Sequence, residues 1–96
     1  MIYKYINDSL NLMTNGDKKA IKEIIYFVKN KHPTYENIIC DFCMNFNYMS
    51  SSIVSYIIGL CYEYGYGVNK NDEREFYYKR FASECDNFFA YCYDSI

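Results

Sequence analysis

Cysteine and histidine are the residues of this sequence whose types and spacing are best suited to metal binding. Cys40 and Cys43 form a C-x-x-C pair, a spacing found in zinc sites and redox motifs. A tetrahedral zinc site needs two further ligands, and no second C-x-x-C follows. The remaining candidates are Cys61, Cys85, Cys92 and His32. Because one pair is weak evidence for a site, we interpret the cysteines as small core residues and predict neither a metal nor another cofactor.

Nucleophilic catalysis is the second chemistry that these residues suggest. A cysteine and a histidine act together when a third group orients the histidine. His32 is the only histidine, it adjoins Pro33, and no orienting group can be nominated from the sequence. We therefore predict that His32 is a loop residue, that the protein has no catalytic residues, and that it is not an enzyme.

Lysines gather in one predicted helix, at Lys18, Lys19, Lys22, Lys29 and Lys31. Such a cluster suits RNA or an acidic protein, but it is also the ordinary composition of a solvated helix face. The net charge of −2 gives no general attraction to nucleic acid or to an anionic membrane. We predict a solvated face and no nucleic-acid partner. A small RNA-binding helical protein that uses this helix remains the alternative function.

The N-terminal segment and the most apolar segment bear on the subcellular location of the protein. The first ten residues are polar and include Asp8, so they do not resemble a signal peptide. Residues 42–62 carry no charge, but the six Asn and Ser residues among them argue against a membrane-spanning helix. The number of cysteines, five, is odd, which together with the lack of an export signal indicates reduced thiols. We predict a cytoplasmic protein with no membrane contact.

Turn-forming residues divide the sequence into segments of helix length. They cluster at residues 15–17, 32–34, 50–52 and 65–71. Between them apolar residues recur at helical spacing, and the clearest stripe is Ile21, Ile24, Ile25 and Val28. We expect helices over residues 2–13, 17–31, 35–48, 52–64 and 72–85, and the start of another at 88–93. This order predicts an all-α fold in which about five or six helices form stacked antiparallel hairpins.

Residues 58–68 contain the most informative motif. Gly59 lies inside a predicted helix, where glycine costs stability, so it indicates the close approach of a neighbouring helix. Gly65 and Gly67 permit a sharp reversal of the chain, and Val68 can pack back onto the hairpin. Asp72 and Glu75 form a capping-box pattern at the start of the next helix.

This motif strongly resembles the Sel-one-like repeat, a relative of the tetratricopeptide repeat. The matching positions are Ile58, Gly59, Tyr62, Gly65, Gly67, Val68, Tyr78, Ala82 and Ala90. Ala90 lies 36 residues after Val54, which suits the period of the family. The sequence departs from the pattern at Asn71, Glu75, Lys79 and Phe81.

The resemblance implies a short α-solenoid and a non-catalytic scaffold or adaptor that binds another protein. Residues 52–87 would be a well-formed repeat, 1–50 a degenerate repeat or N-terminal cap, and 88–96 a degenerate or truncated next repeat. It also implies that the first helix of each hairpin lines a concave face. Three residues would then contact the partner: Tyr56, Leu60 and Glu63.

The aromatic residues Phe88, Phe89, Tyr91 and Tyr93 crowd the C-terminal end. Each repeat of a solenoid relies on its neighbours, so a short array leaves its end faces exposed. We predict either self-association through this end or a chain cut from a longer array.

Overall fold

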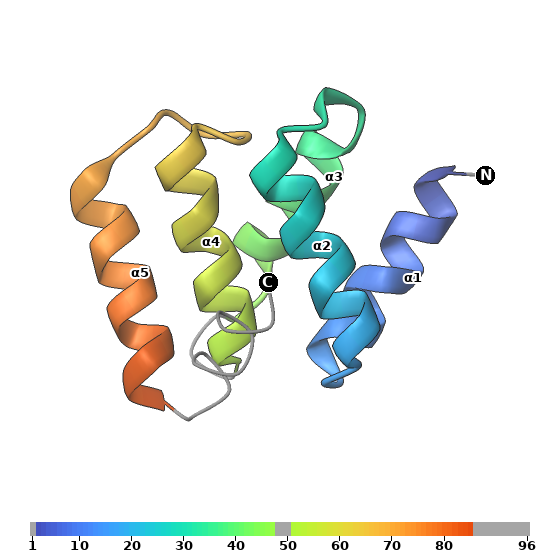
Figure 1. Cartoon of the computed structure of the whole chain (residues 1–96), viewed down its shortest axis with the longest axis horizontal. Coiled ribbons are helices and arrows are strands. Elements are labelled where there is room, and N and C mark those ends of the chain that lie inside the picture. The colour runs from blue at the N-terminus through green and yellow to red at the C-terminus, as the bar shows by residue number, and fades with distance from the viewer. Residues whose placement is uncertain (1, 48–50, 86–96) are drawn as a thin grey trace.

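The computed structural model describes residues 2–47 and 51–85, and every regular element within them is an α-helix. The helices are α1 (Ile2–Thr14), α2 (Lys18–Asn30), α3 (Pro33–Asn45), α4 (Ser52–Tyr64) and α5 (Asp72–Cys85). The predicted all-α fold is confirmed, and the helices pack side by side as short hairpins (Figure 1). The further helix expected at residues 88–93, with Ala90 and the C-terminal aromatic cluster, lies outside the described residues.

Local signals set the ends of α2 and the start of α3. The Asp17 side chain accepts a hydrogen bond from the Ala20 amide (2.9 Å) and caps α2, as its position predicts. Lys31 ends the helix in the left-handed conformation, with φ of 54°. Pro33 then begins α3, two residues earlier than expected. A proline is well placed there because the first turn of a helix has no partner for its missing N–H.

The ends of α4 and α5 follow the same logic, with one correction. Ser51 caps the start of α4 through the Val54 amide, and Gly65 closes its end with φ of 66°. The predicted capping box at Asp72 is wrong. Asn71 caps α5 instead, since its side chain accepts a hydrogen bond from the Arg74 amide (3.0 Å). The Glu75 carboxylate pairs with Lys79 and is not directed back to the helix start.

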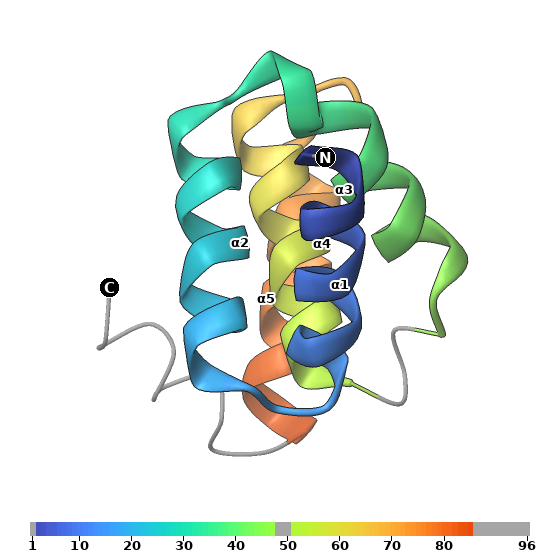
Figure 2. The same ribbon diagram turned by 90° about the vertical axis from the view of Figure 1, so that its right-hand side faces the viewer.

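α4 is the central helix. It contacts each of the other four helices, and all its residues from Ser52 to Tyr62 are buried. The view along the long axis shows α1 and α2 in front of α4, with α5 behind it (Figure 2). The predicted stripe of α2 is buried against this centre, as are Ile6, Leu10 and Met13 of α1. No helix among the described residues is long and apolar enough to cross a bilayer.

Candidate interaction surface

The three residues predicted to contact a partner do not form an open surface. Tyr56 and Leu60 are each only 1% exposed and belong to the hydrophobic core. Neither side chain is therefore exposed in this structure, and direct contact of these residues with a partner stays a prediction. Glu63 lies at the end of α4, and its carboxylate accepts a hydrogen bond from Lys79 Nζ. Its role is to pair with α5.

The other motif residues bring α4 and α5 together. A Cβ atom added to Gly59 would lie 2.7 Å from Lys79 Cγ and 3.4 Å from the Glu75 carbonyl oxygen, so the expected close approach occurs here. Beside this contact the Tyr62 and Tyr78 rings stack, with centroids 5.9 Å apart. Ala82 is fully buried at the same interface, and Ile58 is buried in the core.

The loop after α4 packs onto α3. The Gly67 amide donates a hydrogen bond to Glu36 Oε1 (2.5 Å), and the Cys40 thiol donates one to the Gly67 carbonyl oxygen (3.5 Å). Tyr66 is almost completely buried, and its hydroxyl donates to the His32 carbonyl oxygen (3.1 Å). Val68 is partly buried against the core. Tyr66 had no predicted role, because its only signal in the sequence was its position between two glycines.

Three cysteines are free thiols in the interior: Cys40, Cys43 and Cys61. Burial raises the pKa of the Cys61 thiol to about 12 and that of Cys43 well above its ordinary value. Both thiols are therefore protonated at neutral pH. A cysteine acts as a nucleophile or a metal ligand only as the thiolate. Within residues 2–47 and 51–85, no three His, Cys, Asp or Glu side chains gather in a way that would hold a metal ion.

Burial of Cys61 predicts alkaline destabilisation. The folded protein holds this proton up to about pH 12, whereas an unfolded thiol loses it near pH 8.5. Above the pKa of the unfolded thiol, the unfolded chain binds fewer protons than the folded protein does. The free energy of unfolding should therefore fall by up to about 1.4 kcal/mol per pH unit. Urea titrations between pH 7 and 11 should show that the free energy of unfolding falls less steeply with pH for Cys61→Ala than for the unmodified chain. Parallel curves would contradict this assignment.

His32 lies in an aromatic cluster at the start of α3. Its ring centroid is 5.4 Å from that of Phe27 and 5.9 Å from those of Tyr26 and Tyr35. The Nε2 atom is buried and has no hydrogen-bond partner. The predicted loop position is correct, since His32 precedes α3, but the ring packs at the α2–α3 junction.

The lysine-rich helix exposes part of its charge. Lys18, Lys19 and Lys22 are exposed on α2, and Tyr26 on the same helix is 56% exposed. Lys31 lies elsewhere, with its ammonium group 5.6 Å from the centre of the Tyr64 ring. The cluster is therefore smaller than the five lysines of the sequence suggest, but it contains an exposed aromatic ring.

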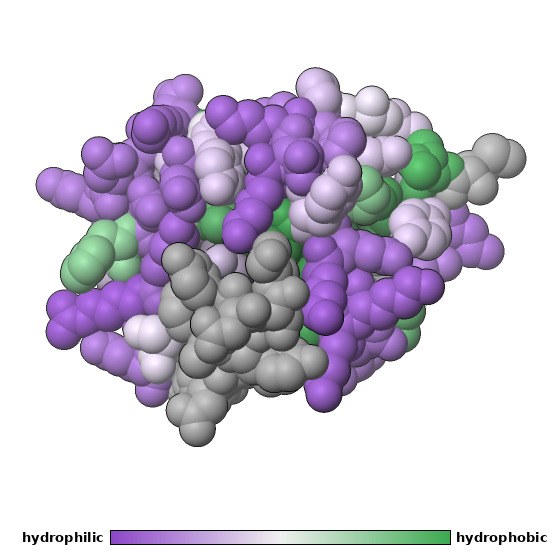
Figure 3. Space-filling model, in the orientation of Figure 1, coloured by the Kyte–Doolittle hydropathy of each residue, from purple (hydrophilic) through white to green (hydrophobic). Residues whose placement is uncertain are grey.

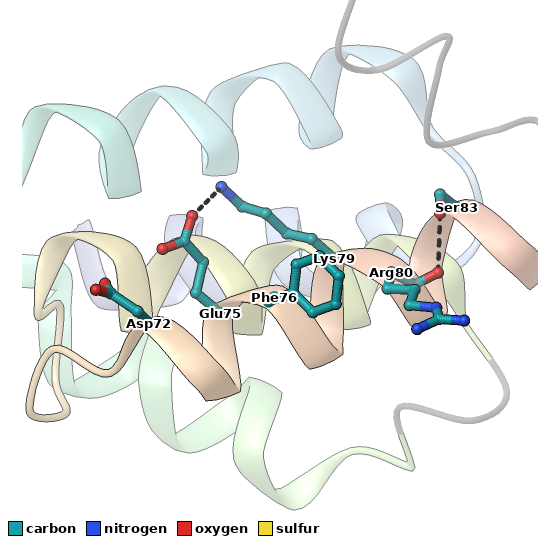
Figure 4. Close-up of a pocket in the computed structure, with 6 residues that line it drawn as sticks. All are labelled: Asp72, Glu75, Phe76, Lys79, Arg80 and Ser83. Atoms are coloured by element: carbon teal, nitrogen blue, oxygen red, sulfur yellow. Dashed lines mark hydrogen bonds and ion pairs between the residues drawn. The ribbon is translucent and has the colours of Figure 1, made fainter.

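The clearest open surface lies on α5, at the end of the helix array. A shallow depression runs along this helix, and its lining comes from α5 alone: Asp72, Glu75, Phe76, Lys79, Arg80 and Ser83. In Figure 4, Glu75 and Lys79 reach toward one another, while Asp72 and Ser83 lie at the two ends of the row. Phe76 is 66% exposed, the highest value among the large apolar side chains of the described chain.

Charged groups frame this depression. Lys79 binds both Glu63 and Glu75, at 2.5 and 2.9 Å, and so ties α5 to α4. Partial burial lowers the pKa of Lys79, but hydrogen bonds to the two carboxylates outweigh it and raise the pKa overall. The surface in the orientation of Figure 3 is mostly hydrophilic, and an apolar patch interrupts it over α5. The sequence did not identify this surface. The helical spacing of Tyr78, Phe81, Ala82 and Cys85 predicts the core stripe of this helix, and Phe76 falls outside it.

Comparisons with protein-family models, with curated proteins and with solved structures gave no significant match. The resemblance to the Sel-one-like repeat therefore rests on the residues of this chain alone, and it stays a prediction.

Proposed function

We propose that this protein is a non-catalytic interaction module that binds a segment of another protein in the depression on α5. The observation that carries the proposal is Phe76, a large aromatic side chain held two-thirds exposed on a helix that is anchored to the core. Aromatic residues are enriched at protein interfaces relative to the rest of the protein surface.

The lining defines the partner by its chemistry. An apolar side chain of the partner would pack on Phe76, while Asp72 and Arg80 offer charges of opposite sign on either side of it. A short segment with an apolar residue between a basic and an acidic residue fits this row. The exposed charges contribute selectivity and association rate more than affinity.

The proposal includes a Sel-one-like repeat at residues 52–87 and a cytoplasmic location for the protein. The contact of Gly59 with α5 and the stacking of Tyr62 on Tyr78 support the repeat, because both join the two helices of one hairpin. A scaffold role in a longer assembly would follow from the family that the motif resembles.

Ser83→Arg tests partner binding, because it places a long cationic side chain in the depression without touching the core. The matched control is Asn11→Arg, which adds the same side chain at an exposed position of α1. We expect a source-cell protein that both the unmodified chain and the control capture, and that Ser83→Arg loses at least roughly tenfold. Equal capture by all three proteins would contradict the proposed site.

RNA binding is the second candidate, and Tyr26 is the observation that favours it. Exposed lysines next to an exposed aromatic ring suit single-stranded nucleic acid, which needs phosphate contacts and a stacking platform. Nuclease treatment of the same capture experiment separates the two functions. Captured material that disappears with nuclease and is lost by Lys22→Glu, but not by Ser83→Arg, would favour RNA.

A further inference from the structure

Among the described helices, α5 packs mainly against α4. Tyr78 and Ala82 face α4, and Lys79 and Glu75 lie at the flank of this contact. The side directed away from α4 carries five exposed residues at helical spacing: Glu73, Phe76, Tyr77, Arg80 and Glu84. Tyr77 is 52% exposed, so this outer stripe presents two aromatic rings to solvent. Of the eight exposed large apolar residues in the described part of the chain, six lie on α1 and α5. Within that part, only on α5 are two adjacent ones flanked by opposite charges.

The outer stripe of α5 is complementary to itself. When two copies of the helix lie antiparallel about a two-fold axis between Phe76 and Tyr77, each Phe76 faces Tyr77 of the partner subunit. The same axis places each Glu73 opposite Arg80 of the partner subunit, because residues 73 and 80 are equally far from it. One axis thus pairs aromatic with aromatic and acid with base, and each pair occurs twice. A two-fold interface requires this kind of self-complementary surface.

We propose that a second copy of this chain packs on the outer stripe of α5 and forms an isologous antiparallel dimer. The Arg80 side chain already binds Glu84 through Nε (2.9 Å). A guanidinium has five N–H donors, so it can hold Glu84 and a second carboxylate together. One helix on one helix is a small interface, and we expect reversible association that depends on concentration.

Charge reversal tests the proposed axis. Glu73→Arg sets two arginines against each other at both ends of the dimer, and Arg80→Glu does the same with two carboxylates. We expect each single variant to raise the dimer dissociation constant at least roughly tenfold in sedimentation equilibrium. The double variant Glu73→Arg/Arg80→Glu restores both pairs with their signs exchanged, and it should associate almost as well as the unmodified chain.

Lys22→Glu is the control, since it changes an exposed charge on α2 and should leave association unchanged. Circular dichroism should show the same helix content in all variants, because Glu73 and Arg80 are exposed. An unmodified chain that stays monomeric up to millimolar concentration would overturn the dimer. So would a double variant as weak as the single ones. The second copy and the proposed partner segment would both contact Phe76 and Arg80, so they compete for this surface. Purified protein without a partner is used, so the dimer can fail while the partner-binding proposal stands.

Discussion

Truncation of Tyr56 to Ala should lower the free energy of unfolding by about 3–5 kcal/mol, the range for large aromatic residues in a core. Tyr56 is among the largest fully buried side chains of the described chain and lies on the central helix. The rigid helices around it cannot collapse fully into the space that its ring leaves. The protein therefore loses both the transfer free energy of the ring and the contacts along the cavity wall. Because small domains have only about 5–15 kcal/mol of stability, the loss will be large.

Urea unfolding followed by circular dichroism measures this change. The matched control is Tyr3→Ala on α1, since Tyr3 is 55% exposed and its truncation should cost less than about 0.5 kcal/mol. Similar midpoints for the two variants, together with loss of a partner in Tyr56→Ala alone, would show that Tyr56 lies on the binding surface that the sequence suggested. Loss of stability and partner together would be the signature of a core residue.

Substitution of Gly67 by Ala should destabilise the protein by about 2–4 kcal/mol, combining backbone strain with overpacking. Gly67 has a φ of 74°, a conformation that an alanine adopts only at a cost. An added Cβ would also lie 2.5 Å from the Cys40 Cβ and 2.8 Å from the Cys40 Sγ. Two hydrogen bonds hold α3 and the loop together, one from the Gly67 amide to Glu36 and one from the Cys40 thiol to the Gly67 carbonyl oxygen. The helix and the loop cannot move apart without losing both.

Gly65→Ala is the control that separates strain from collision. Gly65 has a φ of 66°, but an added Cβ there would have no neighbour closer than 3.6 Å. Gly65→Ala should therefore lose only the free energy that backbone strain costs, about 1 kcal/mol. Unfolding free energies that drop equally in the two variants would mean that the loop does not pack on α3 as closely as the structure shows.

The helices were predictable because their ends are set by local chemistry. Asp17 and Pro33 act through backbone groups within a few residues, and these signals need no knowledge of the rest of the fold. The choice between Asn71 and Asp72 as the cap of α5 was not predictable in the same way. Both side chains are good caps, and the observed bond from the Asn71 backbone amide to the Tyr62 carbonyl oxygen fixes the chain one residue earlier.

The candidate surface was harder to predict because it depends on which helix is central. α4 is apolar on nearly all sides, so its sequence has no stripe that identifies a solvent face. The family resemblance suggested one that contains Tyr56 and Leu60, but both side chains are buried. On α5, by contrast, Phe76 and Tyr77 lie outside the core stripe that the sequence predicts at Tyr78, Phe81, Ala82 and Cys85. That mismatch was visible in the sequence, but its meaning depends on the packing of α5, which among the described helices contacts mainly α4.

Site-specific photo-crosslinking in source cells tests the central claim, that the depression on α5 binds another protein. A photoreactive amino acid replaces Ser83 in one strain and Asn11 in another, at exposed positions of α5 and α1. The account predicts that position 83, and not position 11, crosslinks to a protein other than this chain, identified by mass spectrometry. Crosslinks from position 83 to nucleic acid alone, or no more product than at position 11, would contradict it.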